Sequence, residues 1–436
     1  MDVKSKTVEE WVEIGDSAYK SGDLDQAIEA YKSAIEVNSR ASFAHFKCGT
    51  ALSDKGNFQD AIVYFNNAIL LNTEFAFAYF KRGVALLELN QYKRAIDDFN
   101  SAIKYNPDFS YAYYRKGLAL FRLSKFEEAL ENLTKSIEIN PDYMLAYFYR
   151  ASTHFELENY NQSLQDYSKA LSLNPRYEKS YISRGLVHSK LKQFREALAD
   201  FNAAVTLNPQ SIIARNYRGM IYLYLKNFKS ALDDFNTIIE LEPNNGNFYN
   251  NRGIAYFGLR EYELALENYD RALLLITNSS QIYVNRGNSN IKLGNYIDAI
   301  IDFDKAIELD SSSAQAYFGR GNTYIHLNQF KEALSDLSKA LMISPNFINA
   351  LIARANVFFK LKAYDRAIEE LTKAIDIKPD YARSYLNRAL VFRKIEKYHL
   401  AAQDFEQFLK IYKKKDGISN KIRGWLIKSG YSSDNI

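Results

Sequence analysis

A small residue, glycine or alanine, recurs at a fixed interval of 34 residues through almost the whole chain of 436 residues. Twelve copies follow one another without an insertion: Gly15, Gly49, Gly83, Gly117, Ala151, Gly185, Gly219, Gly253, Gly287, Gly321, Ala355 and Ala389. A second series of small residues begins at Ala27 and a third at Ala34, in the same register. A period of this length indicates tandem supersecondary units, each of which buries its apolar face by stacking on its neighbours. The period therefore argues against division into a few unrelated domains.

Each unit, numbered from position 1 at Val8, contains two apolar patterns with a period of 3.6 residues. A short polar break, such as residues 225–228, separates the two patterns. All seven prolines of the chain occupy position 32, where proline disfavours helix in the residue before it and so marks the end of a unit. With 47% hydrophobic residues and only 18 glycines, the composition is that of a folded protein without the many turns of a sandwich or barrel. The sequence predicts two helices per unit.

The residues at the repeated positions resemble the tetratricopeptide repeat family. Trp11, Gly15, Ala27, Tyr31 and Ala34 of the first unit match its positions 4, 8, 20, 24 and 27, and proline at position 32 completes the pattern. The resemblance implies an all-α fold, a right-handed α-α superhelix (solenoid) of antiparallel helix pairs whose first helices line a concave groove. Four positions depart from the pattern and leave local packing open, at Arg215, Ile238, Phe408 and Lys413.

The repeat register divides the chain into twelve tandem units between an N-terminal lead-in, 1–7, and a C-terminal segment, 416–436. The units span 8–41, 42–75, 76–109, 110–143, 144–177, 178–211, 212–245, 246–279, 280–313, 314–347, 348–381 and 382–415. Apolar residues at helical spacing, Ile418, Ile422, Trp425 and Leu426, predict a helix that caps the exposed core of the twelfth unit.

No arrangement of residues in the sequence is typical of a catalytic centre. The five histidines lie far apart without a recurring acidic or thiol partner, and no metal cluster, phosphate loop or nucleophile motif is present. We therefore expect no enzymatic activity, no cofactor and no small-molecule substrate. The single Cys48 fits a reducing compartment, and the polar residues 1–7 lack the apolar core of a secretory signal, so we expect a soluble, cytoplasmic protein.

Arginine occupies position 7 in most units, and an acidic residue occupies position 23. At 100° per residue, position 7 points toward the second helix and away from the groove. We therefore predict an ion pair inside each such unit, for example Arg184 with Asp200, that fixes the register of the two helices and binds no ligand.

Positions 2, 5, 6, 9 and 13 of the first helix lie opposite the core and are predicted to face the groove. In the second to fifth units these positions carry aromatic and basic residues: Phe43, Phe46, Lys47, Phe77, Phe80, Lys81, Tyr111, Tyr114, Arg115 and Phe148. A row of exposed aromatic side chains indicates a binding surface for an apolar segment. The alternative is that successive first helices pack against one another through positions 2 and 5.

The seventh to twelfth units place side-chain amides on the same face. The candidate residues are Asn216, Asn247, Asn250, Asn251, Asn285, Asn288, Asn322, Asn349 and Asn356. An amide can pair with the N–H and C=O of an extended peptide without demanding a particular sequence. The alternative is a solvated polar groove. The carboxylate clamp of heat-shock co-chaperones is not expected, because it requires lysine at position 5 and no unit has one.

These patterns favour a non-catalytic scaffold or adaptor that binds a peptide segment of a partner protein in the concave groove, and they leave self-association open.

The second hypothesis is an adaptor that binds nucleic acid or an anionic membrane through the basic C-terminal tail. From Lys410 onward the chain contains seven basic residues and two acidic ones. Because the net charge of the whole chain is +4, the rest of the chain is close to neutral. A neutral body argues against a nucleic-acid surface, and basic residues at a helix C-terminus also stabilise the helix dipole. Nucleic acid and membrane are therefore the less favoured partners.

Overall fold

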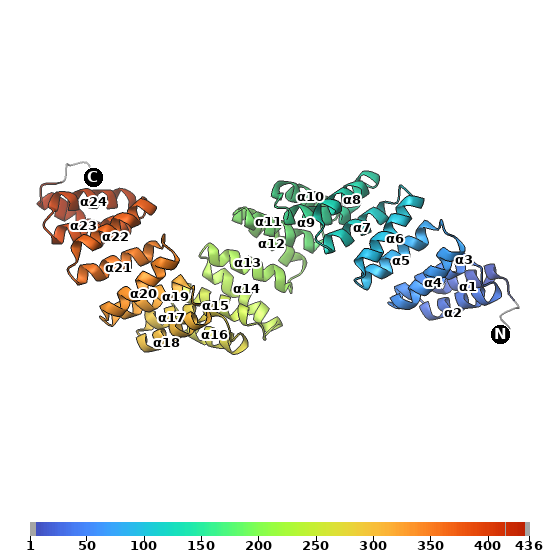
Figure 1. The fold of residues 1–436 in the computed structure, drawn as a ribbon, viewed down its shortest axis with the longest axis horizontal. Helices are drawn as coiled ribbons and strands as arrows, with labels where there is room; N and C mark the ends of the chain where they lie inside the picture. Colours follow the sequence, from blue (N-terminus) through green and yellow to red (C-terminus); the bar gives the residue numbers. More distant parts are fainter. Residues whose placement is uncertain (1–5, 415, 432–436) are drawn as a thin grey trace. The chain divides into compact units, whose positions relative to one another are not determined.

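The computed structural model describes residues 6–414 and 416–431, and all regular secondary structure within them is α-helical. The predicted lead-in and tail fall partly outside the described residues, as does Lys415. The chain divides into two compact units, Met1–Arg218 and Gly219–Ile436, and the boundary lies within helix α13 (Ile212–Tyr224). Within each unit consecutive helices pack side by side in pairs (Figure 1). The all-α prediction is confirmed.

The helices of the N-terminal unit are α1 (Val8–Ser21), α2 (Leu24–Val37), α3 (Ser42–Asp54), α4 (Phe58–Leu71), α5 (Ala76–Glu88), α6 (Tyr92–Tyr105), α7 (Ser110–Arg122), α8 (Phe126–Ile139), α9 (Met144–Glu156), α10 (Tyr160–Leu173), α11 (Glu178–Lys190) and α12 (Phe194–Leu207). Those of the C-terminal unit are α14 (Phe228–Leu241), α15 (Gly246–Leu259), α16 (Tyr262–Leu275), α17 (Ser280–Leu293), α18 (Tyr296–Leu309), α19 (Ala314–His326), α20 (Phe330–Ile343), α21 (Ile348–Lys360), α22 (Tyr364–Ile377), α23 (Ala382–Lys394), α24 (Tyr398–Ile411) and α25 (Gly417–Lys428). Odd-numbered helices up to α23 are the first helices of the repeats.

The repeated small residues allow the two helices of a repeat to approach closely. In the sixth repeat a Cβ atom at Gly185 would lie only 2.8 Å from Cε1 of Phe201 on α12. Ala197 and Ala204, at positions 20 and 27, are fully buried on the same helix. The large ring fills the space that the missing side chain leaves, as close packing of a core requires.

The turn between the two helices of each repeat contains one residue in the left-handed region, always at position 15. Its φ angle lies between 58° and 89° in all twelve repeats. Only three of these residues are glycine: Gly22, Gly56 and Gly294. The others are Asn90, Ser124, Glu158, Lys192, Lys226, Arg260, Asn328, Lys362 and Glu396. Nine non-glycine residues therefore adopt a conformation that is unfavourable for an L side chain, because the connection requires it.

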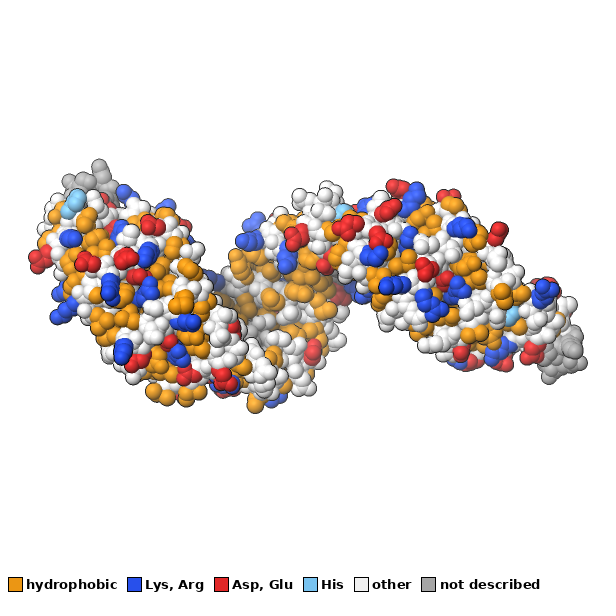
Figure 2. All heavy atoms as spheres, in the orientation of Figure 1, with side chains coloured by type: hydrophobic (Ala, Val, Ile, Leu, Met, Phe, Trp, Pro, Cys, Tyr) orange, Lys and Arg blue, Asp and Glu red, His pale blue; other side chains and the backbone are white. Residues whose placement is uncertain are grey.

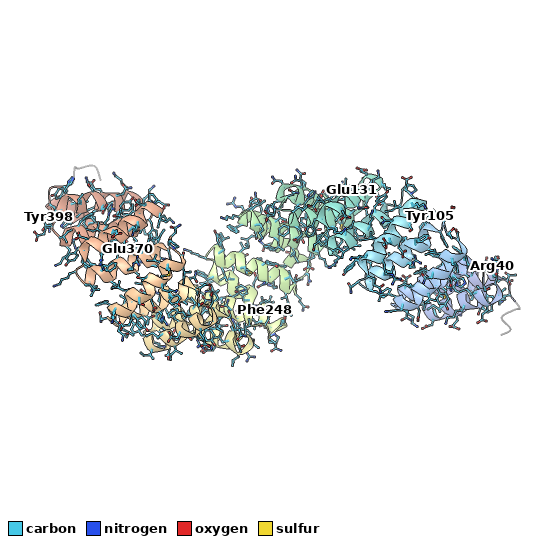
Figure 3. The ribbon with its side chains drawn as sticks, viewed as in Figure 1. Arg40, Tyr105, Glu131, Phe248, Glu370 and Tyr398 are labelled. Atoms are coloured by element: carbon cyan, nitrogen blue, oxygen red, sulfur yellow. The ribbon has the colours of Figure 1, made fainter. Side chains whose placement is uncertain are left out.

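The predicted ion pair between positions 7 and 23 is present. Arg184 Nη2 lies 2.7 Å from Asp200 Oδ1, and Arg184 Nη1 donates to Ser168 Oγ at 2.9 Å, on the second helix of the preceding repeat. The corresponding pairs are Arg82–Asp98, Arg150–Asp166, Arg286–Asp302, Arg320–Asp336, Arg354–Glu370 and Arg388–Asp404. Glu370 on α22 is labelled in Figure 3. Each arginine thus connects three helices.

The repeats without arginine at position 7 also lack the acid at position 23. Lys116 stands opposite Asn132 in the fourth repeat, and Cys48 stands opposite Tyr64 in the second. Burial lowers the pKa of Lys116 and raises the pKa of the Cys48 thiol to about 12. A buried carboxylate therefore occurs where a guanidinium is available to pair with it.

Helix α25 covers the last repeat. Ile422 and Leu426 are buried against Phe405 and Phe408 of α24, and the ring of Trp425 lies 5.2 Å from that of Phe405. Asp416 caps the helix by accepting hydrogen bonds from the backbone N–H groups of Ile418 and Ser419. Helix α25 thus shields the apolar surface at the end of the last repeat from water.

Candidate functional site

The first-helix face of the N-terminal unit carries three exposed aromatic rings at position 2. Phe43 on α3, Phe77 on α5 and Tyr111 on α7 are 51%, 51% and 50% exposed. The three rings come from three consecutive repeats and lie one repeat length apart in the sequence. These residues are the part of the predicted aromatic row that a ligand could reach.

The expectation that position 5 is also open to the groove is wrong for Tyr114 and Phe148, which are buried. Phe46 and Phe80 are partly buried. The cause is a second aromatic residue, at position 34 of the same repeat, whose ring lies against position 5: Phe46–Phe75 at 4.9 Å, Phe80–Phe109 at 4.7 Å, Tyr114–Tyr143 at 4.9 Å and Phe148–Tyr177 at 5.3 Å between centroids. Such offset aromatic contacts stabilise the junction between repeats.

The position 34 rings also contact the exposed row. The ring of Phe77 lies 5.0 Å from Phe109, and the ring of Tyr111 lies 4.8 Å from Tyr143. Aromatic residues at position 34 in these same repeats were the sequence signal for the burial of position 5, and the periodicity of the first helix alone did not reveal it. The alternative of packing between first helices holds in part, because Tyr114 contacts Tyr149 of the following first helix at 5.8 Å.

The basic residues at position 6 differ in their partners. Lys47 Nζ lies 3.0 Å from Asp16 Oδ1 on the preceding first helix. Although partial burial opposes it, hydrogen bonds from Tyr31 and Lys47 hold the pKa of Asp16 below its ordinary value. Lys81 and Arg115 form no ion pair with any described residue. The exposed rings therefore lie beside two cations that are available to a ligand.

Several of the predicted amides bind one another. Asn285 Nδ2 donates to Asn250 Oδ1 at 3.0 Å, Gln281 Nε2 donates to Asn285 Oδ1 at 2.9 Å, and Asn250 Nδ2 donates to Asn251 Oδ1 at 3.4 Å. The first of these bonds connects α15 with α17, and each of the other two lies within one helix. Part of the hydrogen-bonding capacity assigned to a peptide is thus already used inside the protein.

The remaining predicted amides keep more of their capacity. Asn247 is exposed, Asn216 is partly buried, and Asn288 and Asn322 make no side-chain hydrogen bond within the described residues. Asn349 accepts from the Tyr381 hydroxyl at 3.2 Å, and Asn356 accepts from Asn387 Nδ2 at 3.2 Å, so both retain free N–H donors. The unused donors lie mainly in the last four repeats.

A hollow of about 490 Å³ lies on the first-helix face of the C-terminal unit. It is lined by Lys292, Phe318, Asn322, Ile325, His326, Asn349, Ile352, Ala353, Asn356, Tyr381 and Arg383. The structure therefore brings together three predicted site residues, Asn322, Asn349 and Asn356. The basic residues of the hollow are not among the residues predicted from the sequence. Their signal was a basic residue at position 13 in each of the last four repeats.

The described part of the chain contains neither a metal-binding cluster nor a membrane-spanning helix. No group of three or more His, Cys, Asp or Glu side chains is placed to hold a metal ion. No described helix combines the length and apolar character that crossing a lipid bilayer requires. Acidic and basic side chains are interspersed on the face shown in Figure 2.

Family comparisons agree with the helix pairs seen in the structure. The tetratricopeptide repeat models match residues 12–79, 80–143, 145–177, 178–211, 212–245, 246–278, 280–313, 314–347 and 382–415, and a TPR repeat model matches 355–395. The chain belongs to the tetratricopeptide repeat family. Tetratricopeptide repeats generally form non-catalytic scaffolds, and this chain has the fold of a tetratricopeptide repeat scaffold.

Three solved structures are similar to this chain, and the first of them shares its fold. A chain of the crystal structure of the APC/C hetero-tetramer Cut9–Hcn1 is 13% identical with a TM-score of 0.51, covering 95% of each chain. Yeast Tom70 is 17% identical with a TM-score of 0.46, covering 90% of this chain and 96% of its own. MamA is 29% identical with a TM-score of 0.36, covering 38% and 97%. No curated protein sequence matches this chain.

Proposed function

We propose that this tetratricopeptide repeat protein is a cytoplasmic, non-catalytic adaptor that binds a peptide segment of a partner protein along the face of its first helices. The observation that carries the proposal is the row of half-exposed rings formed by Phe43, Phe77 and Tyr111. Exposed large aromatic side chains in a regular row are favourable anchors for an apolar ligand, because they bury much area with little loss of conformational freedom.

The geometry of the row suggests the form of the segment. Packed helices lie roughly 10 Å apart, and an extended chain advances about 3.3 Å per residue. An extended segment with an apolar side chain at about every third residue would thus meet successive rings. Lys81 and Arg115 flank the second and third rings, so acidic residues between the apolar ones are favoured by charge complementarity.

Selection from a library of random twelve-residue peptides displayed on phage tests this function. The full chain is the bait, and the variant Phe43→Ala/Phe77→Ala/Tyr111→Ala is compared with it. The matched control is Val63→Ala/Leu70→Ala, because these side chains are 56% and 78% exposed on α4, a second helix. We expect the enriched peptides to carry spaced apolar residues. They should bind the row variant at least tenfold more weakly than the unaltered chain, and they should bind the control variant with unchanged affinity. Equal affinity for all three proteins would contradict the proposal.

One observation keeps the second candidate function open to test: Lys413 and Lys414 are exposed just before α25. As an adaptor for nucleic acid or an anionic membrane, the protein would bind through this segment, and its affinity would fall steeply with salt. Reversal of both residues to glutamate should then abolish binding to single-stranded RNA or to phosphatidylserine vesicles at low salt. Unchanged binding would exclude the segment as the site.

A further inference from the structure

We propose that the first-helix face of the last four repeats binds an acidic, extended internal segment of a partner protein, with the hollow between α17 and α23 as its centre. This inference rests on the general adaptor function proposed above, but it concerns a different unit of the chain and none of the residues of the aromatic row.

The first observation is the sign of the charge on this face. Positions 2, 5, 6, 9, 12 and 13 of the four repeats contain no Asp or Glu. They contain five permanent cations, Lys292, Lys360, Arg383, Arg393 and Lys394, all exposed. None of the five forms an ion pair with another described residue, in contrast to Lys305 and Lys373 on the second helices of the same repeats. A face of one sign without internal counter-charges attracts a ligand of the opposite sign.

The second helices of these repeats, by contrast, carry acidic side chains that offset nearby lysines, as Glu308 does for Lys305 and Glu369 for Lys373. The N-terminal unit also differs, because position 13 is acidic in three of its six repeats, Asp54, Glu88 and Glu156, and basic in the other three. The absence of acids is therefore a property of the first-helix face in the last four repeats and does not follow from the repeat pattern.

The second observation is the hydrogen-bonding character of the hollow. Among the described residues, Asn322 makes no side-chain hydrogen bond, and Asn349 and Asn356 act only as acceptors, so each has N–H donors to offer. Carboxylates only accept hydrogen bonds, and bonds to a charged acceptor are stronger than neutral ones. Lys292 and Arg383 lie on the lining of the same hollow. Donors and cations together thus favour a carboxylate.

The third observation is the apolar part of the hollow. Phe318, Ile352 and Ala353 contribute to its lining, and the ring of Phe318 lies 4.9 Å from that of Phe347. A volume of about 490 Å³ is within the range of ligand-binding cavities. A peptide can place an apolar side chain here while its acidic neighbours meet the cations. Single-stranded RNA needs exposed aromatic platforms for its bases, and Phe318 is partly buried in packing, so the face favours a peptide over RNA.

The distribution of cations indicates an internal segment and not a chain terminus. Lys292, Lys360 and Lys394 occur at position 13 of three different repeats, and Arg383 occurs at position 2 of the last. A single terminal carboxylate can meet only one or two of these groups. Several side-chain carboxylates along an extended chain can meet them in succession, because extended residues advance about 3.3 Å each.

The test uses the full chain and a fluorescein-labelled peptide, (Glu-Leu-Asp-Ser)₃ with an amidated C-terminus. Its neutral counterpart is (Gln-Leu-Asn-Ser)₃, and fluorescence anisotropy at low and at physiological salt gives the affinities. The variant Lys292→Glu/Lys360→Glu removes two cations of the face. The matched control Lys331→Glu/Lys339→Glu makes the same charge change on α20, where both lysines are exposed and unpaired within the described residues. Circular dichroism establishes that all proteins have equal helicity.

We expect the acidic peptide to bind at least tenfold more tightly than the neutral one, and the face variant to lose at least tenfold in affinity while the control stays within twofold. Equal binding of the two peptides, or an equal loss in both variants, would overturn the proposal. Tighter binding of oligouridylate of matched charge would replace it by a nucleic-acid site, and a requirement for a free C-terminal carboxylate would replace the internal segment by a terminus. If the aromatic-row variant alone abolishes binding, this inference fails while the proposed adaptor function stands.

Discussion

Arg320 on α19 and Asp336 on α20 form two parallel hydrogen bonds, from Nε to Oδ2 and from Nη2 to Oδ1, each 2.7 Å long. Arg320 Nη1 also donates to Asp304 Oδ1 of the preceding repeat. The carboxylate is buried, whereas the arginine side chain keeps 21% of its surface exposed. The pair recurs along the chain, so one side chain repeatedly sets both the register within a repeat and the contact between two repeats.

Replacement of Arg320 by alanine should destabilise the surrounding repeats by about 3 kcal/mol, because it leaves the Asp336 carboxylate buried without a partner. The double variant Arg320→Met/Asp336→Leu should lose much less, since no buried charge remains. Hydrogen exchange of the α19 and α20 amides measures the local opening free energy, which suits a stack of repeats better than a global transition. The pair does not act in this way if Arg320→Ala lowers the opening free energy by less than about 1 kcal/mol, or if the double variant lowers it as much as the single variant does.

Because the residue at position 15 is left-handed, we expect two substitutions there to change the stability in opposite directions. Gly56→Ala should lower stability by about 1 kcal/mol, because an L side chain is strained at a φ of 89° even though no atom lies within 4 Å of the new Cβ. Lys192→Gly should raise stability by a smaller amount, since it relieves that strain but loosens the unfolded chain. Urea unfolding followed by circular dichroism reports both changes. Changes of the same sign would contradict the assignment of strain to this position.

Two tyrosines of α7, Tyr111 and Tyr114, should respond differently to truncation. Tyr114 is 3% exposed and packs on Tyr143 and Tyr149, so Tyr114→Ala should cost about 3 kcal/mol or more. Tyr111 is 50% exposed, so Tyr111→Ala should change stability by less than about 1 kcal/mol while weakening ligand binding. Thermal unfolding and the peptide assay separate the two roles, and an equal loss of stability in both variants would assign Tyr111 to packing as well.

The cap of α25 should depend on pH. Hydrogen bonds from the Tyr412 hydroxyl and from the backbone N–H groups of Ser419 and Ile418 hold the pKa of Asp416 below its ordinary value. Because the folded-state pKa is the lower one, this carboxylate stabilises the cap fully above the unfolded value of about 3.9, and the contribution is lost as the pH falls through the folded value.

The fluorescence of Trp425, recorded in a Trp11→Phe background, should therefore report a loosening of α25 on acidification below about pH 4. Asp416→Asn removes the titrating group, so its fluorescence should vary less across the same range. A titration that is identical in the two proteins would show that other groups control the cap.

The repeat, the helix pairs and the ion pairs were all predictable from the sequence, because they depend on contacts within one 34-residue unit. Gly185 meets Phe201 and Arg184 meets Asp200 across the short connection between the two helices of one repeat, so the helical period and that connection together bring them into contact. The left-handed residue at position 15 was not predictable from composition, since only three of the twelve residues are glycine and the connection imposes the conformation on the rest.

The accessible part of the candidate site was decided by tertiary structure. Tyr114 and Phe148 lie on the predicted face, but the rings of Tyr143 and Tyr177 cover them, and the helical pattern of one helix contains no information about a ring that arrives from the end of the repeat. Likewise Lys292 and Arg383 stand three repeats apart in the sequence and line the same hollow. Only the stacking of successive repeats brings such residues together, because burial and charge on a shared face depend on neighbours that are distant along the chain.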